Sequence, residues 1–229
     1  MKAAVLVLAL AATLALSACG GDDGNATSTG PLPMNQRVVT KEDAPDFAAD
    51  PVEKPVTVAS ADEFITRLGE RFINPTPDEV EEFKSGGFVR AFHVTRFVPG
   101  SGGTHLRNAP HIFSLAMQFD SDQGADDALA LFKTDSIRPC PETCASQAEQ
   151  FDVGGIPGAY GTHRFATAES IQQTGDQEGR PYDEYQIGFA DGVFAYRVTV
   201  SGDPGKVTQD EADEIAKSLY DRVKGQPPA

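Results

Sequence analysis

Residues 185–200 read Tyr185-Gln186-Ile187-Gly188-Phe189-Ala190-Asp191-Gly192-Val193-Phe194-Ala195-Tyr196-Arg197-Val198-Thr199-Val200, and this stretch decides the fold. Large apolar residues occupy every second position on both sides of Asp191-Gly192. Alternation with a period of two predicts strands with one buried face, and Asp-Gly is a favoured two-residue hairpin turn. The stretch therefore predicts an antiparallel β-hairpin.

Other strands and four helices are predicted on either side of this hairpin. Residues 88–98 are rich in aromatic and β-branched residues, residues 113–119 alternate between apolar and polar side chains, and residues 159–168 follow a turn-rich segment. Capping signals and apolar residues at helical spacing predict the helices. The helices are expected from Ser60 to about residue 73, from Thr76 to Gly86, over residues 122–134, and from Thr208 to Gly225.

The order of these elements predicts an α+β fold, in which helices pack on one face of an antiparallel sheet. A strand, further antiparallel strands and a closing helix occur over residues 88–134 and again over residues 159–224. This repetition raises the hypothesis of a duplicated strand-strand-helix unit, with descent by duplication left open.

The first segment has the layout of an export signal. Lys2 precedes an apolar run from Ala3 to Leu16, which is shorter than the roughly 20 residues that span a bilayer. The tetrad Leu16-Ser17-Ala18-Cys19 resembles the bacterial lipobox. This resemblance implies that residues 1–18 are a signal peptide and that Cys19 carries lipid after cleavage. A plain secretory signal is the alternative.

Residues 19–55 are expected to form a lipidated flexible tether, and residues 56–225 a single α+β domain. The tether begins with a polar stretch, rich in glycine and threonine, that is too poor in large apolar groups to offset the entropy of ordering. The lipobox and this layout resemble uncharacterised secreted lipoproteins of high-GC Gram-positive bacteria (actinobacteria). The resemblance implies a place at the outer face of the cell membrane, and it implies no activity.

The strongly acidic composition limits the classes of partner. The formal charge is −15 and becomes −16 when Lys2 is removed, so nucleic acid is not an expected partner and the membrane is reached only through the lipid on Cys19.

Cys140 and Cys144 remain as an even pair in an exported chain, which predicts a structural disulfide that closes a short loop. A redox-active pair is the alternative, although the spacing is not CxxC.

No motif for a metal, a cofactor or a nucleophile is found. The four histidines are His93, His105, His111 and His163, and no HxxxH, HxH or Cys/His spacing places two ligands on one rigid element. The glycine-rich loop at residues 99–104 lacks the lysine and helix of a phosphate cradle. No metal site and no cofactor are therefore expected.

Four arginines in predicted strands form the one candidate binding constellation, and they are Arg90, Arg96, Arg164 and Arg197. If the sheet placed them on one uncovered face, they would bind a phosphate, an anionic glycan or a carboxylate. Cross-strand salt bridges with the many acidic residues are the alternative.

These observations predict a membrane-anchored, non-enzymatic binding or accessory module that recognises an unknown envelope protein or small ligand. The alternative is a carrier of an apolar or lipid ligand, whose interior cavity would be lined by Phe88, Phe92, Phe113, Phe119, Phe194 and Tyr196. An enzyme would need a cleft that unites several acids or histidines.

Overall fold

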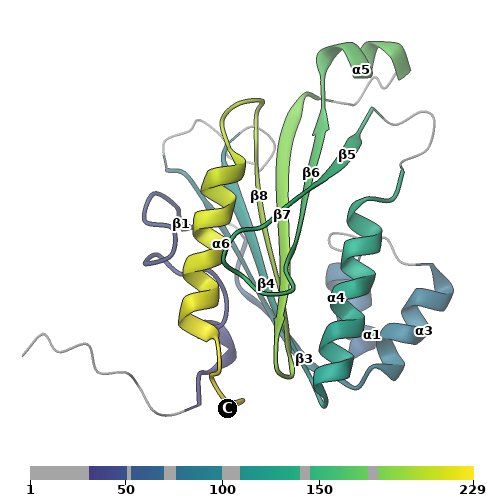
Figure 1. Ribbon diagram of the computed structural model, residues 1–229, viewed down its shortest axis with the longest axis vertical. Helices are drawn as coiled ribbons and strands as arrows, with labels where there is room; N and C mark the ends of the chain where they lie inside the picture. The colour runs from purple at the N-terminus through teal and green to yellow at the C-terminus, as the bar shows by residue number, and fades with distance from the viewer. Residues whose placement is uncertain (1–30, 51–52, 70–75, 100–108, 140–144, 175–179) are drawn as a thin grey trace, which may run out of the picture.

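The structure is a computed structural model that describes residues 31–50, 53–69, 76–99, 109–139, 145–174 and 180–229 (Figure 1). Its strands are β1 (Ala48–Ala49), β2 (Val56–Val58), β3 (Phe88–Phe97), β4 (His111–Phe119), β5 (Gln147–Phe151), β6 (Tyr160–Ala166), β7 (Tyr182–Asp191) and β8 (Phe194–Gly202). Its helical segments are η1 (Met34–Gln36), α1 (Ala61–Phe64), η2 (Ile65–Gly69), α3 (Pro77–Ser85), α4 (Asp122–Ser136), α5 (Ala168–Thr174) and α6 (Gln209–Val223).

The strands form one antiparallel sheet in the order β1-β3-β4-β8-β7-β6-β5, with β2 also paired to β3. The predicted hairpin is confirmed as β7 and β8. Its turn lies one residue later than expected, because Asp191 pairs with Phe194 and leaves Gly192 and Val193 between them. Gly192 has a φ of 55°, a left-handed conformation that favours glycine. The α+β class is confirmed.

Helices cover both faces of the sheet, whereas the sequence predicted them on one (Figure 1). Ala195 packs with the core of α1, α3 and α4, while its neighbour Tyr196 packs with the core of α6. Successive side chains of a strand point to opposite faces, so each helix layer has its own core. We call these faces the α4 face and the α6 face. The expectation of one covered face therefore holds for α1, α3 and α4 but not for α6.

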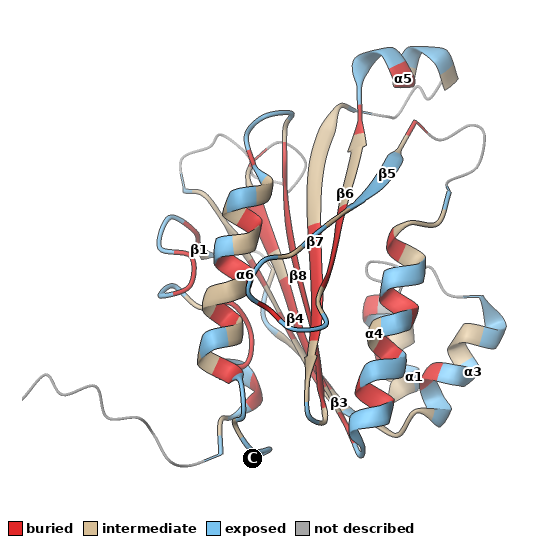
Figure 2. Cartoon of the chain, viewed as in Figure 1, coloured by how far each residue is buried: buried red, intermediate tan, exposed pale blue. Residues whose placement is uncertain are grey.

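The two faces are apolar because both sets of alternate residues in the central strands are buried, which Figure 2 shows as red along β4 and β8. Ile112, Ala116 and Val198 belong to the α6 face, and Leu115 and Met117 to the α4 face. The expected order of a duplicated unit recurs as β3-β4-α4 and β7-β8-α6, but the closing helices lie on opposite faces. Duplication stays a prediction.

Part of the expected tether belongs to the folded domain. Val38, Val39, Ala44 and Phe47 are buried in the core of the α6 face, and the amide of Val39 donates to Ser114 Oγ on β4 at 2.9 Å. The domain boundary expected at residue 56 is therefore corrected, since the described chain already contributes to the core before residue 50. The sequence did not reveal this, because these apolar residues are scattered without a period.

Several expected features lie outside the described residues. These are the signal peptide, the lipidation site Cys19, the pair Cys140 and Cys144, and His105. Within the described ranges, no helix is both long and apolar enough to span a membrane.

Candidate functional site

A pocket of about 350 Å³ opens on the α4 face, between the start of β2, the middle of β3 and the helical turn η2. Its lining residues are Glu53, Lys54, Val56, Arg67, Leu68 and His93. We call this the His93 pocket. Its volume is close to the lower end of the range for small-molecule sites, about 300–1,000 Å³.

The floor of the His93 pocket is built by paired strands and a helical turn. Val56 on β2 is paired with His93 on β3, so their side chains lie next to each other on one face of the sheet. His93 is 2% exposed and Leu68 is 3% exposed. The floor therefore joins apolar surface to one buried imidazole.

A change of helix type places Arg67 and Leu68 at the pocket. Ser60 caps α1 by accepting a hydrogen bond from the amide of Glu63, as the sequence predicts. The chain then continues as a π-helical turn, η2, to Gly69, and the expected end of this helix near residue 73 lies outside the described residues. Phe64, the last residue of α1, is fully buried and stacks on Phe83 of α3 with 5.0 Å between ring centroids. Short π-helical turns are frequent at functional sites.

Three side chains fix the orientation of His93. Thr95 Oγ1 lies 2.6 Å from Glu53 Oε2 and 3.5 Å from His93 Nε2. A hydroxyl has one proton and an ionised carboxylate only accepts, so Thr95 donates to Glu53 and accepts from His93 Nε2. His93 Nε2 therefore carries a proton. The ring also stacks against Phe113 on β4, with 6.1 Å between centroids.

The rim of the pocket carries charges of both signs. Arg67 Nη1 donates to Glu63 at 2.7 Å and to the carbonyl of Thr57 at 3.4 Å. Hydrogen bonds from the Ala59 amide and from Arg67 lower the pKa of Glu63, so this carboxylate is ionised and holds the guanidinium. Lys54 is exposed and pairs with no carboxylate of the described residues. Two cations and Glu53 thus surround the opening.

The four arginines of the predicted constellation do not share a face. Arg90 and Arg96 lie on the α6 face of β3, where Arg90 donates to Gln118 at 2.7 Å and Arg96 donates to the carbonyl of Phe47 at 3.0 Å. Arg164 and Arg197 lie on the α4 face. The interpretation that all four form one anion site is therefore corrected.

Arg197 is buried, which makes it different from the other three. Its Nη2 donates to Gln186 Oε1 at 2.7 Å, and its guanidinium lies 5.7 Å from the ring centre of Phe132 on α4. Gln186 in turn donates to Glu184. The sequence predicted salt bridges with acids as the alternative role, and here a neutral amide connects the arginine to a carboxylate.

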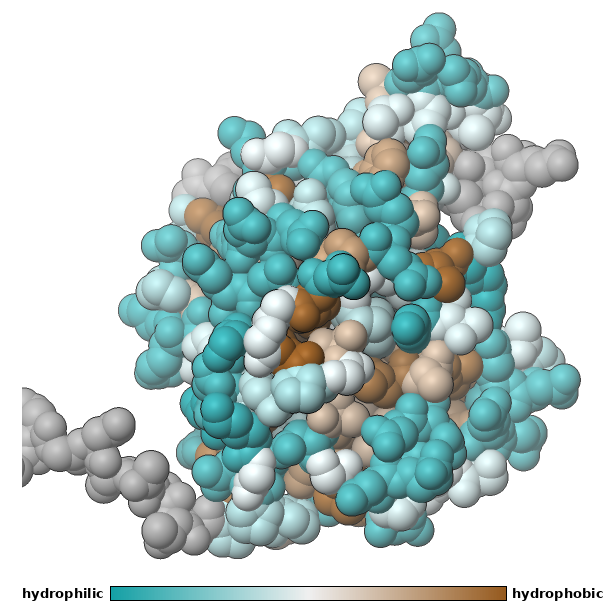
Figure 3. All heavy atoms as spheres, viewed as in Figure 1, coloured by the Kyte–Doolittle hydropathy of each residue, from teal (hydrophilic) through white to brown (hydrophobic). Residues whose placement is uncertain are grey.

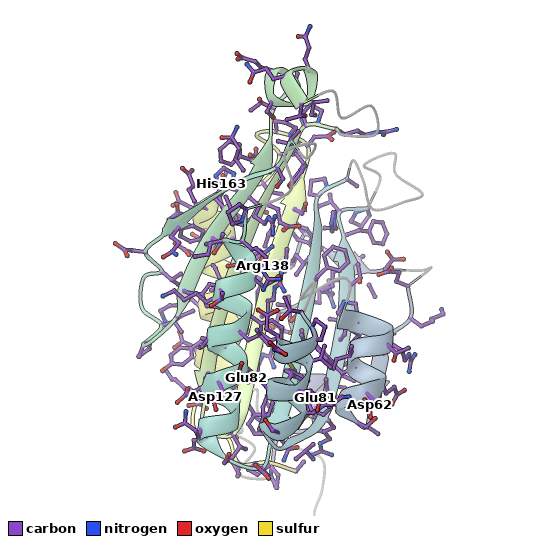
Figure 4. All side chains as sticks on the ribbon, turned by 90° about the vertical axis from the view of Figure 1, so that its right-hand side faces the viewer. Asp62, Glu81, Glu82, Asp127, Arg138 and His163 are labelled. Carbon is purple, nitrogen blue, oxygen red and sulfur yellow. The ribbon has the colours of Figure 1, made fainter. Side chains whose placement is uncertain are left out.

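The histidines occupy separate places. His111 is buried at the start of β4, where burial lowers its pKa and its Nδ1 lies 2.9 Å from the carbonyl of Ala109. His163 on β6 contacts Glu149 at 3.2 Å and Asp183 at 3.0 Å, and it lies apart from the acidic residues Asp62, Glu81, Glu82 and Asp127 on the helices (Figure 4). Over the described ranges, no three His, Cys, Asp or Glu side chains come together as a metal site.

The aromatic residues proposed for a carrier cavity pack in two separate cores. Phe119 lies in the core of the α4 face, with Phe88 and Phe113 packed against it. Phe194 and Tyr196 lie in the core of the α6 face, with Phe92 packed against it. Because the sheet separates the two sets, they do not line one cavity, and the expected carrier cavity is corrected.

The surface agrees with a chain that keeps its apolar residues inside. Figure 3 shows hydrophilic side chains over most of the face in view, with hydrophobic ones gathered near its middle. Among the described large apolar residues, Val89 is the exposed one, at 41%.

Comparison with known proteins gives a likeness of fold. No family model matches the chain, and no curated protein matches it. The crystal structure of the extracellular domain of PknH from Mycobacterium tuberculosis is similar, with a TM-score of 0.51 and 12% identity over 86% of this chain and 98% of that one. An uncharacterised Mycobacterium smegmatis protein, an Rv0999 ortholog, has a TM-score of 0.40 and 12% identity over 79% of this chain and 90% of that one.

Sequence reasoning missed most of the His93 pocket. Glu53 and Lys54 fell in the expected tether, and Arg67 lay on a predicted helix without a partner in view. One signal was present, since His93 alternates with Ala91 and Thr95 on what proves to be a buried face of β3. A buried histidine in a strand marks a candidate site when a charged residue faces it.

Proposed function

We propose that the chain is a lipid-anchored extracytoplasmic binding module that catalyses no reaction, and that the His93 pocket is its ligand site. The pocket is the observation that carries the proposal. Its floor is a buried histidine oriented by Thr95 and Glu53, and its charged rim offers several hydrogen-bonding groups. A concave site with apolar surface and a few placed polar groups is the usual form of a small-molecule site.

The place of action is supported by two independent features. The tetrad Leu16-Ser17-Ala18-Cys19 resembles a lipobox, and the fold is similar to the extracellular domain of PknH. Acyl chains contribute about 0.8 kcal/mol for each buried methylene, so two or three chains hold a domain at a membrane.

Replacing Cys19 by alanine tests the anchor. We expect the parent chain to partition into detergent-extracted membranes and the Cys19→Ala chain to remain in the soluble or unprocessed fraction. Equal partitioning of both chains into the membrane fraction contradicts lipid anchoring. Intact-mass analysis of the parent adds a second readout, because diacylglycerol on Cys19 raises the mass.

The pocket is tested by a matched pair of variants in β2. Val56 lines the pocket, whereas its neighbour Thr57 is exposed on the opposite face of the strand. We expect native mass spectrometry of the protein purified from envelope to show a small bound molecule. The Val56→Trp chain should lose this molecule, because indole fills the pocket, and the Thr57→Trp chain should retain it. A ligand retained equally by both variants, or bound by neither the variants nor the parent, contradicts the proposal.

A further inference from the structure

We propose that the ligand of the His93 pocket is a small organic anion, whose carboxylate or phosphate group is held by Lys54 and Arg67 and whose apolar body lies against Val56 and Leu68. This inference rests on the proposed function, since it names the class of ligand for the same site. It differs from the rejected arginine constellation, because neither of these two cations belonged to it.

Arg67 has N–H donors that no residue of the described chain uses. Glu63 and the carbonyl of Thr57 are both contacted by Nη1, so the hydrogen bonds of Arg67 within the described chain use one of its three nitrogens. A guanidinium has five N–H donors in a planar fork that matches the two oxygens of a carboxylate or phosphate. Glu63 thus fixes the side chain and leaves the N–H groups of Nε and Nη2 for another acceptor.

Lys54 is the second cation of the pocket. It lines the same pocket from the segment just before β2, it is exposed, and it forms no ion pair within the described ranges. A flexible ammonium group of this kind acts as a point charge for an anion. Arg67 therefore offers the pocket a guanidinium held in place by Glu63, and Lys54 offers it a flexible ammonium group.

The carboxylate of Glu53 does not cancel this preference. Its Oε2 accepts a hydrogen bond from Thr95 Oγ1 at 2.6 Å at the floor, beside His93, and its single negative charge faces two positive charges, on Lys54 and Arg67, in the same lining. The net charge of the chain, −15, also does not exclude an anion. At physiological ionic strength the Debye length is about 8 Å, so distant acids are screened while contacts inside the pocket are not.

The apolar floor and the volume limit the rest of the ligand. Leu68 is buried and Val56 is half-buried, and together they offer a hydrophobic wall below the charged rim. A pocket of about 350 Å³ fits a compact molecule and is small for a membrane lipid or a folded peptide. The expected ligand is therefore a metabolite-sized organic acid or phosphate ester.

Matched probes of equal length test the class of ligand by calorimetric titration of the processed full-length chain. We expect hexanoate to bind with a Kd of about 1 mM, and hexanol and hexylammonium to bind at least about tenfold more weakly. Hexyl phosphate should bind at least as well as hexanoate if phosphate is the preferred group. Equal binding of hexanol and hexanoate overturns the anion preference and leaves the proposed pocket intact. Failure of every probe to bind overturns the preference as well.

Charge-removing variants locate the contact. We expect Lys54→Gln and Arg67→Gln each to weaken hexanoate binding about tenfold and to leave hexanol binding unchanged. Lys206→Gln is the control, because Lys206 is an exposed lysine in the turn before α6. Equal weakening by all three variants means a general charge effect and contradicts the assignment. The Val56→Trp chain tests the pocket separately from the preference for an anion. If it binds neither hexanoate nor hexanol, the result supports the His93 pocket as the binding site, whatever the charge of the ligand.

Discussion

Arg37 shows how one side chain joins distant parts of the chain. It is fully buried, and its guanidinium lies 3.7 Å from the ring centre of Phe194. It donates to the carbonyl of Leu32 at 3.0 Å, to Tyr196 Oη at 2.8 Å and to the carbonyl of Gln226 at 2.9 Å. A buried cation is stable only when its donors are satisfied, so these contacts tie the first and last described segments to β8.

Two tyrosines test this requirement, because only one of them binds Arg37. Tyr196 Oη accepts from Arg37, whereas Tyr160 Oη is buried with no hydrogen-bond partner among the described residues. We expect Tyr196→Phe to lower the free energy of unfolding by about 1–3 kcal/mol, because a buried donor of Arg37 loses its acceptor. Tyr160→Phe should be neutral or stabilising. Urea unfolding measures both, and a larger loss for Tyr160→Phe would refute the account.

The same two hydroxyls predict an alkaline limit. Burial raises the pKa of Tyr160 to about 12 and that of Tyr196 to about 12, above the usual value near 10. A raised pKa means that the folded state favours the neutral phenol. The contribution of these two tyrosines to the free energy of unfolding is therefore complete below pH 10 and is lost as the pH rises from about 10 to about 12. Tyrosinate absorbance should show these two groups ionising together with unfolding. Ionisation near pH 10 in a protein with native circular dichroism would be the opposite result.

The sequence predicted the alternation that buries Tyr196. It did not predict which of the four arginines lie on the same face of the sheet. Arg197 and Tyr196 are neighbours on β8, so alternation alone places them on opposite faces. Which residues of β3 and β6 share a face with Arg197 depends on the register between the strands. Register is a property of the assembled sheet. For this reason Arg90 and Arg164 looked equivalent in sequence and lie on opposite faces in the structure.

At the scale of elements, close contact between α3 and α4 depends on a glycine. A Cβ atom added to Gly124, in the first turn of α4, would lie 2.0 Å from the carbonyl oxygen of Gly86. The obstructing atom belongs to the backbone at the end of α3, so it does not move aside without shifting the helix. The end of α3 and the start of α4 are therefore in direct backbone contact.

We expect Gly124→Ala to destabilise the protein by about 1–3 kcal/mol, although alanine favours an isolated helix. Gly154→Ala is the matched control, because no atom lies within 4 Å of its added Cβ and its φ is not positive. This control should change stability by less than about 1 kcal/mol. Thermal unfolding of both variants gives the comparison, and equal melting temperatures would argue against close helix contact.

Helices with local signals were predictable, and the element that builds the pocket was not. Caps at Thr76, Ser121 and Thr208 accept hydrogen bonds from amides three residues later, and these helices lie where the sequence places them. The π-helical turn η2 has no such signal, because it arises where Phe64 and Leu68 pack into the core. The strands β1 and β2 have two and three residues, too few for a visible period.

At the scale of the whole molecule, the folded unit begins before residue 56. Val38, Val39 and Phe47 are buried on the α6 face, and each such side chain contributes about 1.5–3 kcal/mol. Their sum approaches the total stability of a typical domain, about 5–15 kcal/mol. Residues 31–50 are therefore part of the folded core.

Two shortened chains test the boundary. We expect a chain that begins at residue 31 to unfold at the same urea concentration as the processed protein. A chain that begins at residue 56 should be unfolded or aggregated, since it also lacks Arg37 and leaves Tyr196 without its partner. A cooperative unfolding transition of normal stability in the shorter chain would show that the earlier segment is dispensable.

The global layout was predicted in outline, and the candidate site was largely not. The acidic composition and the α+β class are visible in composition and periodicity, because these are properties of single segments, whereas the export signal stays a prediction. The His93 pocket joins residues 53–56, 67–68 and 93, which meet only after the sheet and helices assemble. The carrier and four-arginine hypotheses failed for the same reason, since both assumed that residues of one type share one face.

The most direct test of the account is a nuclear magnetic resonance titration of the processed chain with hexanoate, followed on methyl and amide signals. The account predicts that the largest shifts occur at Val56, Leu68 and His93, with smaller shifts at Thr95. It also predicts that Val56→Trp abolishes them. Shifts centred on α6 or on the β5 edge, or no shifts at concentrations well above the Kd, would contradict it.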